Sequence, residues 1–279
     1  MQRGKGVPTE TLSPAELGER WPALHAERYR VGTYSATDGF ADPHLAVQGF
    51  AAAAREVGVE IRTKTAVTDV LRDGGRVVGV ETEDERVEAD FVVNAAGPWA
   101  RRVAAMADVE IPVAPRRRQV AVVDPETPVP EDVPLTADVV SGSYFRPERE
   151  GRALVGGHFD DRDPDADPDR FGESMETGWA VEATERAAET ADYFGPETRI
   201  RRGWAGLYAL TPDDNPIVEE TAPGFVQAVG FSGHGFQHAP ATGQVVADLC
   251  LDGSTDVVSL DPYRGDRFDD ATEGEGYVV

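Results

Sequence analysis

The sequence predicts an α+β protein, because helical and strand patterns occupy separate stretches of the chain. The chain has 279 residues and a hydrophobic content of 40%, which is enough for one large or two modest globular domains. Capped helical stretches come first, and between residues 59 and 97 the apolar pattern changes to short strands separated by turns. No internal repeat is visible in the sequence.

Two helices near the start of the chain are predicted from their capping residues. Ser13, Pro14 and Glu16 follow the capping-box pattern, in which the serine and the glutamate bond to each other's backbone N–H groups. The second helix spans residues 42–58, from an Asp-Pro start to a glycine stop.

The middle of the chain is dominated by strand patterns. Four strands are predicted at residues 59–63, 66–73, 76–83 and 86–97, with Asp73–Gly75 as a hairpin turn. The remaining predicted elements are strands at 113–125 and within 143–161, a solvated acidic loop at 160–169, a helix at 173–192, two strands within 199–220, a strand at 224–230, a helix at 240–251 and a loose acidic tail from residue 253.

The charge balance limits the classes of partner. The chain carries 27 basic and 51 acidic residues, a net charge of −24, which argues against nucleic acid as a partner. Because the acids are spread along the chain, they favour the solvated surface of a halophile's protein over a docking face for a basic partner. No apolar stretch approaches the roughly 20 residues of a membrane span. Cys250 is the single cysteine, so we expect no internal disulfide, no metal site and a cytoplasmic location.

A glycine-rich segment, "GFSGHGFQHAPATG" at residues 230–243, lies between an apolar strand and a helix. Free N–H groups at a helix N-terminus, backed by the helix dipole, favour an anion or an electron-rich carbonyl edge. The alternative is a tight turn that uses glycine for positive φ. The segment is not the G-x-G-x-x-G dinucleotide motif, because the third glycine is missing. A similar run of small residues ends the strand at 92–100, where close packing is the alternative to a ligand.

Several motifs together resemble the FAD-dependent superfamily of D-amino-acid oxidase, sarcosine oxidase, glycine oxidase and dimethylglycine dehydrogenase. They are "DGFADPHL", the long run from "GVEIRT" to "NAAGPWA", "YFRP", "GGHF", "GWAGLYALTPDDNPIV" and "GFSGHGFQHAPATG", in the family's order over roughly residues 8–252. The resemblance implies a two-domain α+β flavoprotein fold. It implies an FAD-binding domain of residues 35–113 and 206–255, a substrate domain of 1–34 and 114–205, and an acidic tail of 256–279.

The resemblance also implies the residues around the cofactor. The segment "GFSGHGF" would lie along the flavin ring, Val67 would meet the adenine, and the loop after the strand at 92–94 would lie beside the cofactor. The implied FAD-binding residues are Val67, Ala95, Ala96, Gly97, Trp99, Gly206, Gly230, Ser232, Gly233, His234, Gly235, Phe236 and Gln237. Monomeric sarcosine oxidases attach flavin to a cysteine where this chain has Gly206, so we expect no covalent bond between flavin and this chain.

The implied reaction is oxidation of the C–N bond of a small amine or amino acid. By resemblance, His158 in "GGHF" matches an active-site histidine, and Tyr144 and Arg146 in "YFRP" are candidates to face the substrate. For the latter two, strand packing and a surface ion pair are the alternatives. Sarcosine oxidases carry a lysine at the position of Leu154, where its charge promotes reaction with oxygen. Leucine there implies slow reaction with oxygen and a quinone, a dye or a protein as the electron acceptor; the alternative is that Arg146 or Arg152 supplies the positive charge.

One departure from the family pattern is large. The family begins with a strand, a G-x-G-x-x-G turn and a helix that hold the FAD pyrophosphate, and the sequence given contains no such motif. We therefore expect the sequence to be truncated at its N-terminus. Two further possibilities follow, a non-catalytic remnant and a subunit or assembly protein that needs a separately made N-terminal half.

Overall fold

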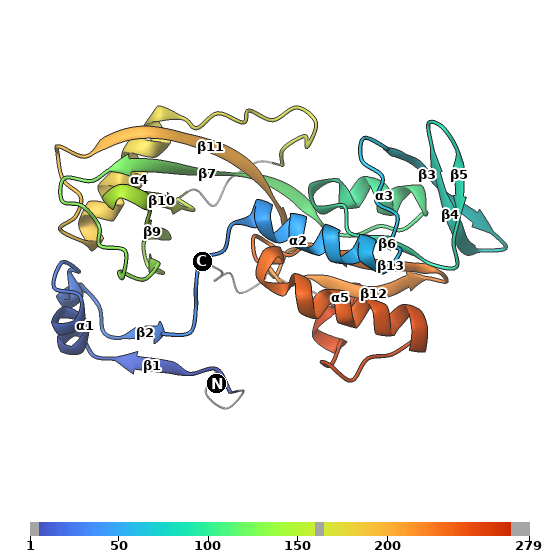
Figure 1. Cartoon of the computed structure of the whole chain (residues 1–279), viewed down its shortest axis with the longest axis horizontal. Coiled ribbons are helices and arrows are strands. Elements are labelled where there is room, and N and C mark those ends of the chain that lie inside the picture. Colours follow the sequence, from blue (N-terminus) through green and yellow to red (C-terminus); the bar gives the residue numbers. More distant parts are fainter. Residues whose placement is uncertain (1–5, 160–164, 269–279) are drawn as a thin grey trace.

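The computed structural model describes residues 6–159 and 165–268 and confirms the predicted α+β class (Figure 1). Its largest sheet is antiparallel, with strand order β11-β7-β10-β9-β8. The strands are β7 (Ala114–Asp124), β8 (Thr136–Asp138), β9 (Ser143–Pro147), β10 (Ala153–Gly157) and β11 (Arg199–Leu210). Helix α4 (Thr177–Thr190) covers one face of this sheet, where its alanines pack against Phe145 and Val155 in a buried core.

A second group of elements lies at the other end of the long strands β7 and β11 (Figure 1). It contains the mixed sheet β12-β13-β6, the antiparallel sheet β3-β4-β5 and helices α3 and α5. The bounds are β3 (Val67–Asp73), β4 (Arg76–Thr82), β5 (Arg86–Glu88), β6 (Val92–Asn94), α3 (Ala100–Met106), β12 (Ile217–Ala222), β13 (Phe225–Val229) and α5 (Gly235–Asp252). Its core joins Val70, Ile217 and Phe225 to residues at the ends of β7 and β11, so the long strands connect the two groups.

The first residues of the described chain form a small separate layer. β1 (Thr9–Leu12) pairs with β2 (Gly32–Ser35), and α1 (Pro14–Arg20) packs Leu17 beside them. The predicted capping box of α1 is present in full, with Ser13 and Glu16 bonded reciprocally. The strands of this layer were not predicted from the sequence.

Helix α2 (Pro43–Glu56) begins as predicted, with the Asp42 carboxylate accepting from the N–H groups of His44 and Leu45. None of its residues is buried, and Phe50 is 63% exposed. Leu45 and Val47 are exposed as well, so one described helix carries a large apolar surface without a cover. Exposed apolar surface of this kind is typical of a contact with another segment or chain.

The structure corrects several expectations about individual elements. Residues 59–63 are not a strand, because no described strand pairs with them, and the predicted strand at 86–97 is divided into β5 and β6. The helix predicted at 173–192 is confined to Thr177–Thr190. The helix predicted to start at Pro240 begins five residues earlier, at Gly235, so Pro240 lies inside the helix and leaves one backbone hydrogen bond unmade.

Two segments predicted to be loose are held by side chains. Arg102 pairs with Asp167 and Asp169, and the Trp99 indole donates to Asp169 at 2.7 Å, so the described part of the loop at 160–169 is attached to α3. Residues 253–268 pack on β12, where Arg267 donates to Asp213 at 2.8 Å. The rest of the predicted acidic tail lies outside the described residues.

Candidate functional site

The face of the large sheet opposite α4 collects the polar side chains of the site. Strand register places Tyr144 of β9 next to Gly156 of β10, and Gly156 next to Val120 of β7. Two residues along β7, Arg118 is paired with Gly206 of β11. Because alternate residues of a strand point to the same face, these residues and Tyr208 share one face of the sheet. Phe145 and Val155 point to the other face, into the core beneath α4.

His158 follows β10 and lies on the same side. Its ring meets the Tyr208 ring edge-on, with centroids 5.6 Å apart. The buried Nδ1 atom has no hydrogen-bond partner among the described residues. Burial, together with the charge of Arg118, lowers the pKa of His158 to about 4, so the ring is neutral at pH 7. A buried polar atom without a partner is unusual and marks a place where a ligand can bind.

A pH-dependent stability follows from the lowered pKa of His158. Unfolding returns the imidazole to an ordinary pKa near 6.5, so between about pH 4 and 6.5 the unfolded chain binds more protons than the folded one. The free energy of unfolding should therefore rise with pH across this window, and His158→Gln should reduce the slope. Chemical denaturation of both proteins at several pH values measures it, and equal slopes would show that His158 titrates normally.

Tyr144 is packed across Gly156. A Cβ atom at Gly156 would collide with the phenol ring, so glycine is required there. Burial raises the pKa of Tyr144 well above its ordinary value, and the hydroxyl therefore stays protonated as a hydrogen-bond donor.

Arg146 lies farther along the same face of β9. Its guanidinium stands 4.9 Å from the centroid of the Phe40 ring and 3.6 Å from the Glu148 carboxylate. Arg146 therefore makes an ion pair and a ring contact within the protein. An ion pair was the alternative to a substrate contact that the sequence left open. Its role at the substrate stays a prediction.

Arg118 is the cation closest to His158 and Tyr208, and sequence reasoning missed it. Its guanidinium lies 6.0 Å from the centroid of the Tyr208 ring, and its Nε and Nη1 atoms are buried. Burial lowers the pKa of Arg118, although an arginine remains charged at pH 7. The sequence does contain one relevant signal. In a strand, alternate residues point to opposite faces, so in "RRRQ" at 116–119 only Arg116 and Arg118 can share a face with Gly206.

The glycine-rich segment faces this group of side chains. Gly230 has φ +73°, and a Cβ there would collide with Thr211. Gly233 has φ +88°, and a Cβ there would collide with the Tyr208 ring. Both the tight turn and the close approach therefore require glycine. Ser232 is buried, with its hydroxyl donating to the carbonyl of Gly230 at 3.3 Å, so this side chain holds the turn.

Helix α5 starts at the end of this segment. His234 is its N-cap and provides no side-chain cap, so the first N–H groups of the helix, at Gly235, Phe236 and Gln237, are not bonded by the cap. The dipole of an 18-residue helix favours negative charge at this end. Asp214, in the turn before β12, also lies near His234 and Arg118, and burial raises the pKa of its carboxyl.

The remaining predicted residues lie in two other places. Ala95 and Ala96 follow β6, and Gly97 has φ +52° with open space where a Cβ would stand. Trp99 follows Gly97 and is held by Asp169. Val67 begins β3, in the small antiparallel sheet, and is 38% exposed.

Comparisons with known proteins complete the description. A family model described as FAD dependent oxidoreductase matches residues 1–249. A bovine (Bos taurus) FAD-dependent oxidoreductase domain-containing protein 1 is 30% identical over 96% of this chain, and the chain spans 61% of its length. A 4-methylaminobutanoate oxidase (formaldehyde-forming) of Paenarthrobacter nicotinovorans is 31% identical over 90% of the chain and 31% of its own length. Among solved structures, L-proline dehydrogenase from P. horikoshii has a TM-score of 0.84 at 29% identity, covering 96% of this chain and 71% of that one.

Proposed function

Because the chain belongs to the family of FAD-dependent oxidoreductases, we propose that it takes part in oxidising the C–N bond of a small amino acid. The observation that carries the proposal is the polar face of the large sheet. There a partly buried arginine, a neutral histidine and two tyrosines share one side of the sheet, and the Tyr208 ring lies against Gly233 of the glycine-rich turn. In the same proposal, residues 35–113 and 206–255 bind the cofactor, and residues 1–34 and 114–205 bind the substrate.

The residues present fit a flavin ring. Gly206 has open space where a Cβ would stand, although it lies in the middle of a long strand. Opposite the same face, Gly230 and Gly233 keep side chains out of the turn, and the N-terminus of α5 favours negative charge. FAD, when bound, supplies the oxidant that accepts a hydride. Gly206, the segment 230–237 and the loop 95–99 would hold it.

The flavin is proposed to be bound without a covalent bond to this chain. Cys250 lies about four turns after the start of α5, or roughly 22 Å along its axis. It packs beside the buried residues Val218, Val226 and Leu249, and burial raises its pKa. A partly buried, protonated thiol at that distance is unsuited to attachment.

Arg118 is the group proposed to bind the substrate carboxylate. A buried guanidinium attracts a carboxylate strongly because little water screens the pair. Proline and 4-methylaminobutanoate, named in two relatives, both carry a carboxylate and a secondary amine. The same positive charge and the burial around His158 would favour the neutral form of a bound amine, which is the form that can give up a hydride.

The test is anaerobic reduction of the FAD-loaded protein by a panel of compounds, followed through the loss of flavin absorbance. Each amino acid is compared with the amine that lacks its carboxylate, for example proline with pyrrolidine and sarcosine with dimethylamine. Reduction should be fast with one class of amino acid and slow with the matched amines. If dithionite reduces the flavin and no amino acid does, the proposal is wrong.

A second candidate function rests on the uncovered apolar surface of α2. A subunit or assembly protein that kept the fold would present such a surface to its partner. The same experiment separates the two functions, because an assembly protein would not pass electrons from any amino acid to FAD.

The electron acceptor is proposed to be a quinone or a protein rather than oxygen. Leu154 is buried on the polar face, paired across the sheet with Arg146 and Val122, and cannot supply a positive charge. Leu154→Lys should increase the rate at which oxygen reoxidises the reduced flavin by about tenfold or more, since a nearby cation stabilises developing superoxide. Stopped-flow mixing of photoreduced protein with oxygen measures it, with Leu154→Met as the neutral control of similar size. An unchanged rate in a folded lysine variant would contradict the assignment.

A further inference from the structure

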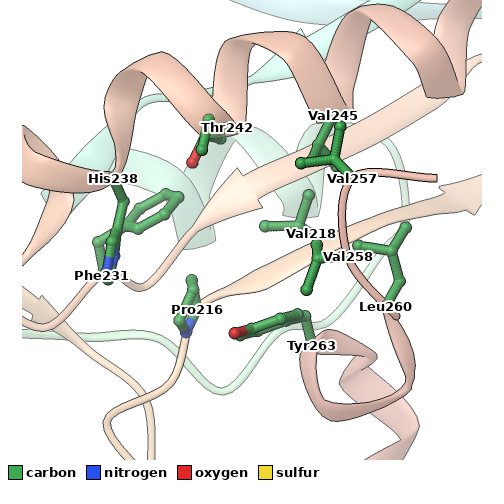
Figure 2. A pocket seen from close by; sticks show the side chains of 11 residues that line it. Pro216, Val218, Phe231, His238, Thr242, Val245, Val257, Val258, Leu260 and Tyr263 are labelled. Atoms are coloured by element: carbon green, nitrogen blue, oxygen red, sulfur yellow. The ribbon is translucent and has the colours of Figure 1, made fainter. Parts of the chain in front are cut away.

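A largely apolar cavity lies beside helix α5. Its volume is about 190 Å³, and it lies between α5, β12 and the segment 257–263 and is open to solvent on one side, where Val257 and Val258 are exposed (Figure 2). Of the segments named above as candidates for the flavin or the substrate, only 230–237 contributes a lining residue, Phe231. The residues that line it are Pro216, Val218, Phe231, His238, Ala241, Thr242, Val245, Val257, Val258, Leu260 and Tyr263.

The lining is apolar with three polar groups and no charged residue. Figure 2 shows the hydroxyl groups of Thr242 and Tyr263 and the ring of His238 toward one side, with Val245, Val257 and Leu260 toward the other. Partial burial and the nearby His234 lower the pKa of His238, which favours the neutral ring at pH 7. A ligand for this cavity should therefore be uncharged and apolar, with oxygen atoms at one end that can accept hydrogen bonds.

The size of the cavity limits the ligand further. An apolar cavity of about 150 Å³ is known to hold a benzene molecule. At about 190 Å³, this cavity has room for one six-membered ring with small substituents. It is too small for a peptide or a nucleotide, whose pockets are typically larger than roughly 300 Å³.

Aromatic rings connect this cavity to the glycine-rich turn. The His238 ring in the cavity lies 6.2 Å from the His234 ring and 6.1 Å from the Phe231 ring, measured between centroids. His234 is the N-cap of α5, at the end proposed to meet the flavin. The cavity therefore adjoins the proposed flavin site at Phe231, and its His238 lies about one turn of α5 from His234.

From this arrangement we propose that the cavity binds the ring of a neutral quinone, which serves as the electron acceptor of the reduced cofactor. The proposal rests on the proposed function, since it needs a reduced flavin as donor. With FAD bound, two electrons and two protons would pass from its reduced form, which returns to oxidised FAD. The quinone takes up both electrons and both protons, so its two carbonyl groups become the hydroxyl groups of a hydroquinone. Tyr263, Thr242 and His238 supply the hydrogen bonds that position the carbonyl oxygens.

Direct binding tests the cavity without turnover. Duroquinone, a tetramethylated benzoquinone, is titrated into the FAD-loaded protein by calorimetry. Both Ala241 and Ala247 are exposed, but only Ala241 lines the cavity. Ala241→Phe adds a ring at the cavity wall and should raise the Kd about tenfold or more, whereas Ala247→Phe should leave it unchanged. Tyr263→Phe keeps the ring and loses one hydrogen bond, so the Kd should rise about two- to tenfold.

Reoxidation gives the second measurement. The flavin is photoreduced, so no amino acid is required, and is then mixed with duroquinone or with ferricyanide. Ala241→Phe should slow reoxidation by duroquinone by the same factor as the Kd rises and leave the rate with ferricyanide unchanged. The proposal is overturned if duroquinone does not bind, or if Ala241→Phe and Ala247→Phe bind and react alike. Failure of amino-acid oxidation alone would affect neither measurement, so the two proposals can fail separately.

Discussion

Arg118→Gln should raise the KM for the amino acid about 100- to 1,000-fold, which corresponds to roughly 3–4 kcal/mol of lost binding. The guanidinium has buried nitrogen atoms and lies beside Tyr208, so a carboxylate bound there would be poorly screened by water. Glutamine removes the charge and keeps an N–H donor at about the position of the arginine Nε, so it tests the electrostatic part of the binding. Steady-state kinetics with the substrate found by flavin reduction measures the change.

The adjacent arginine provides a matched control. Arg117 points to the opposite side of β7, where it donates to the carbonyl of Gly172 at 2.8 Å and pairs with Glu176 at 2.8 Å. Arg117→Gln should leave KM within about twofold, because a partly exposed pair of this kind contributes little. An amine without a carboxylate should react equally with the original protein and with Arg118→Gln. If Arg117→Gln and Arg118→Gln change the KM by the same factor, Arg118 does not bind the substrate carboxylate.

The contrast between these arginines shows why part of the site could not be predicted from the sequence. The capped helices, the strands β3, β4 and β13 and the glycine-rich turn carry local signals, and the structure contains all of them. Arg118 sits in a run of three arginines, and its face is set only by pairing with Gly206 on a strand almost ninety residues later. Tyr208 is placed by the same pairing, with Arg116 opposite it. Register across a sheet is a non-local property, so a single sequence cannot supply it.

The errors at the ends of elements have a similar origin. Pro240 indicates a helix start, yet the glycine-rich turn places the start at Gly235, where it faces Tyr208. Residues 253–268 are polar in composition, and they pack because Arg267 finds Asp213 and because Leu260 and Tyr263 cover apolar residues of β12 and α5. Each of these outcomes depends on partners distant in sequence. Composition alone therefore predicted a loose tail where the structure has a packed segment.

Two glycine substitutions should test two different roles of glycine. Gly233 is required for the conformation of the turn, and Gly206 is proposed to leave space for the flavin ring. Gly233→Ala should destabilise the protein by at least about 2 kcal/mol, because φ is +88° and the methyl group would collide with the Tyr208 ring. Gly206→Val should leave stability within about 1 kcal/mol, because Gly206 lies in a strand, has no positive φ and has nothing within 4 Å of the added Cβ. Denaturant unfolding in the absence of FAD measures both changes.

Gly206→Val should change the affinity for FAD much more than it changes the stability of the protein. If the flavin ring lies over Gly206, the valine side chain occupies its place, and the Kd for FAD should rise about tenfold or more while the fold stays intact. Equilibrium titration with FAD, followed by flavin fluorescence, measures this. Gly172→Ala, at an exposed loop glycine that also has nothing within 4 Å of the added Cβ, should change neither stability nor affinity by more than about twofold. A folded Gly206→Val protein with unchanged affinity would place the flavin elsewhere, since no bound ring could then lie against the middle of β11.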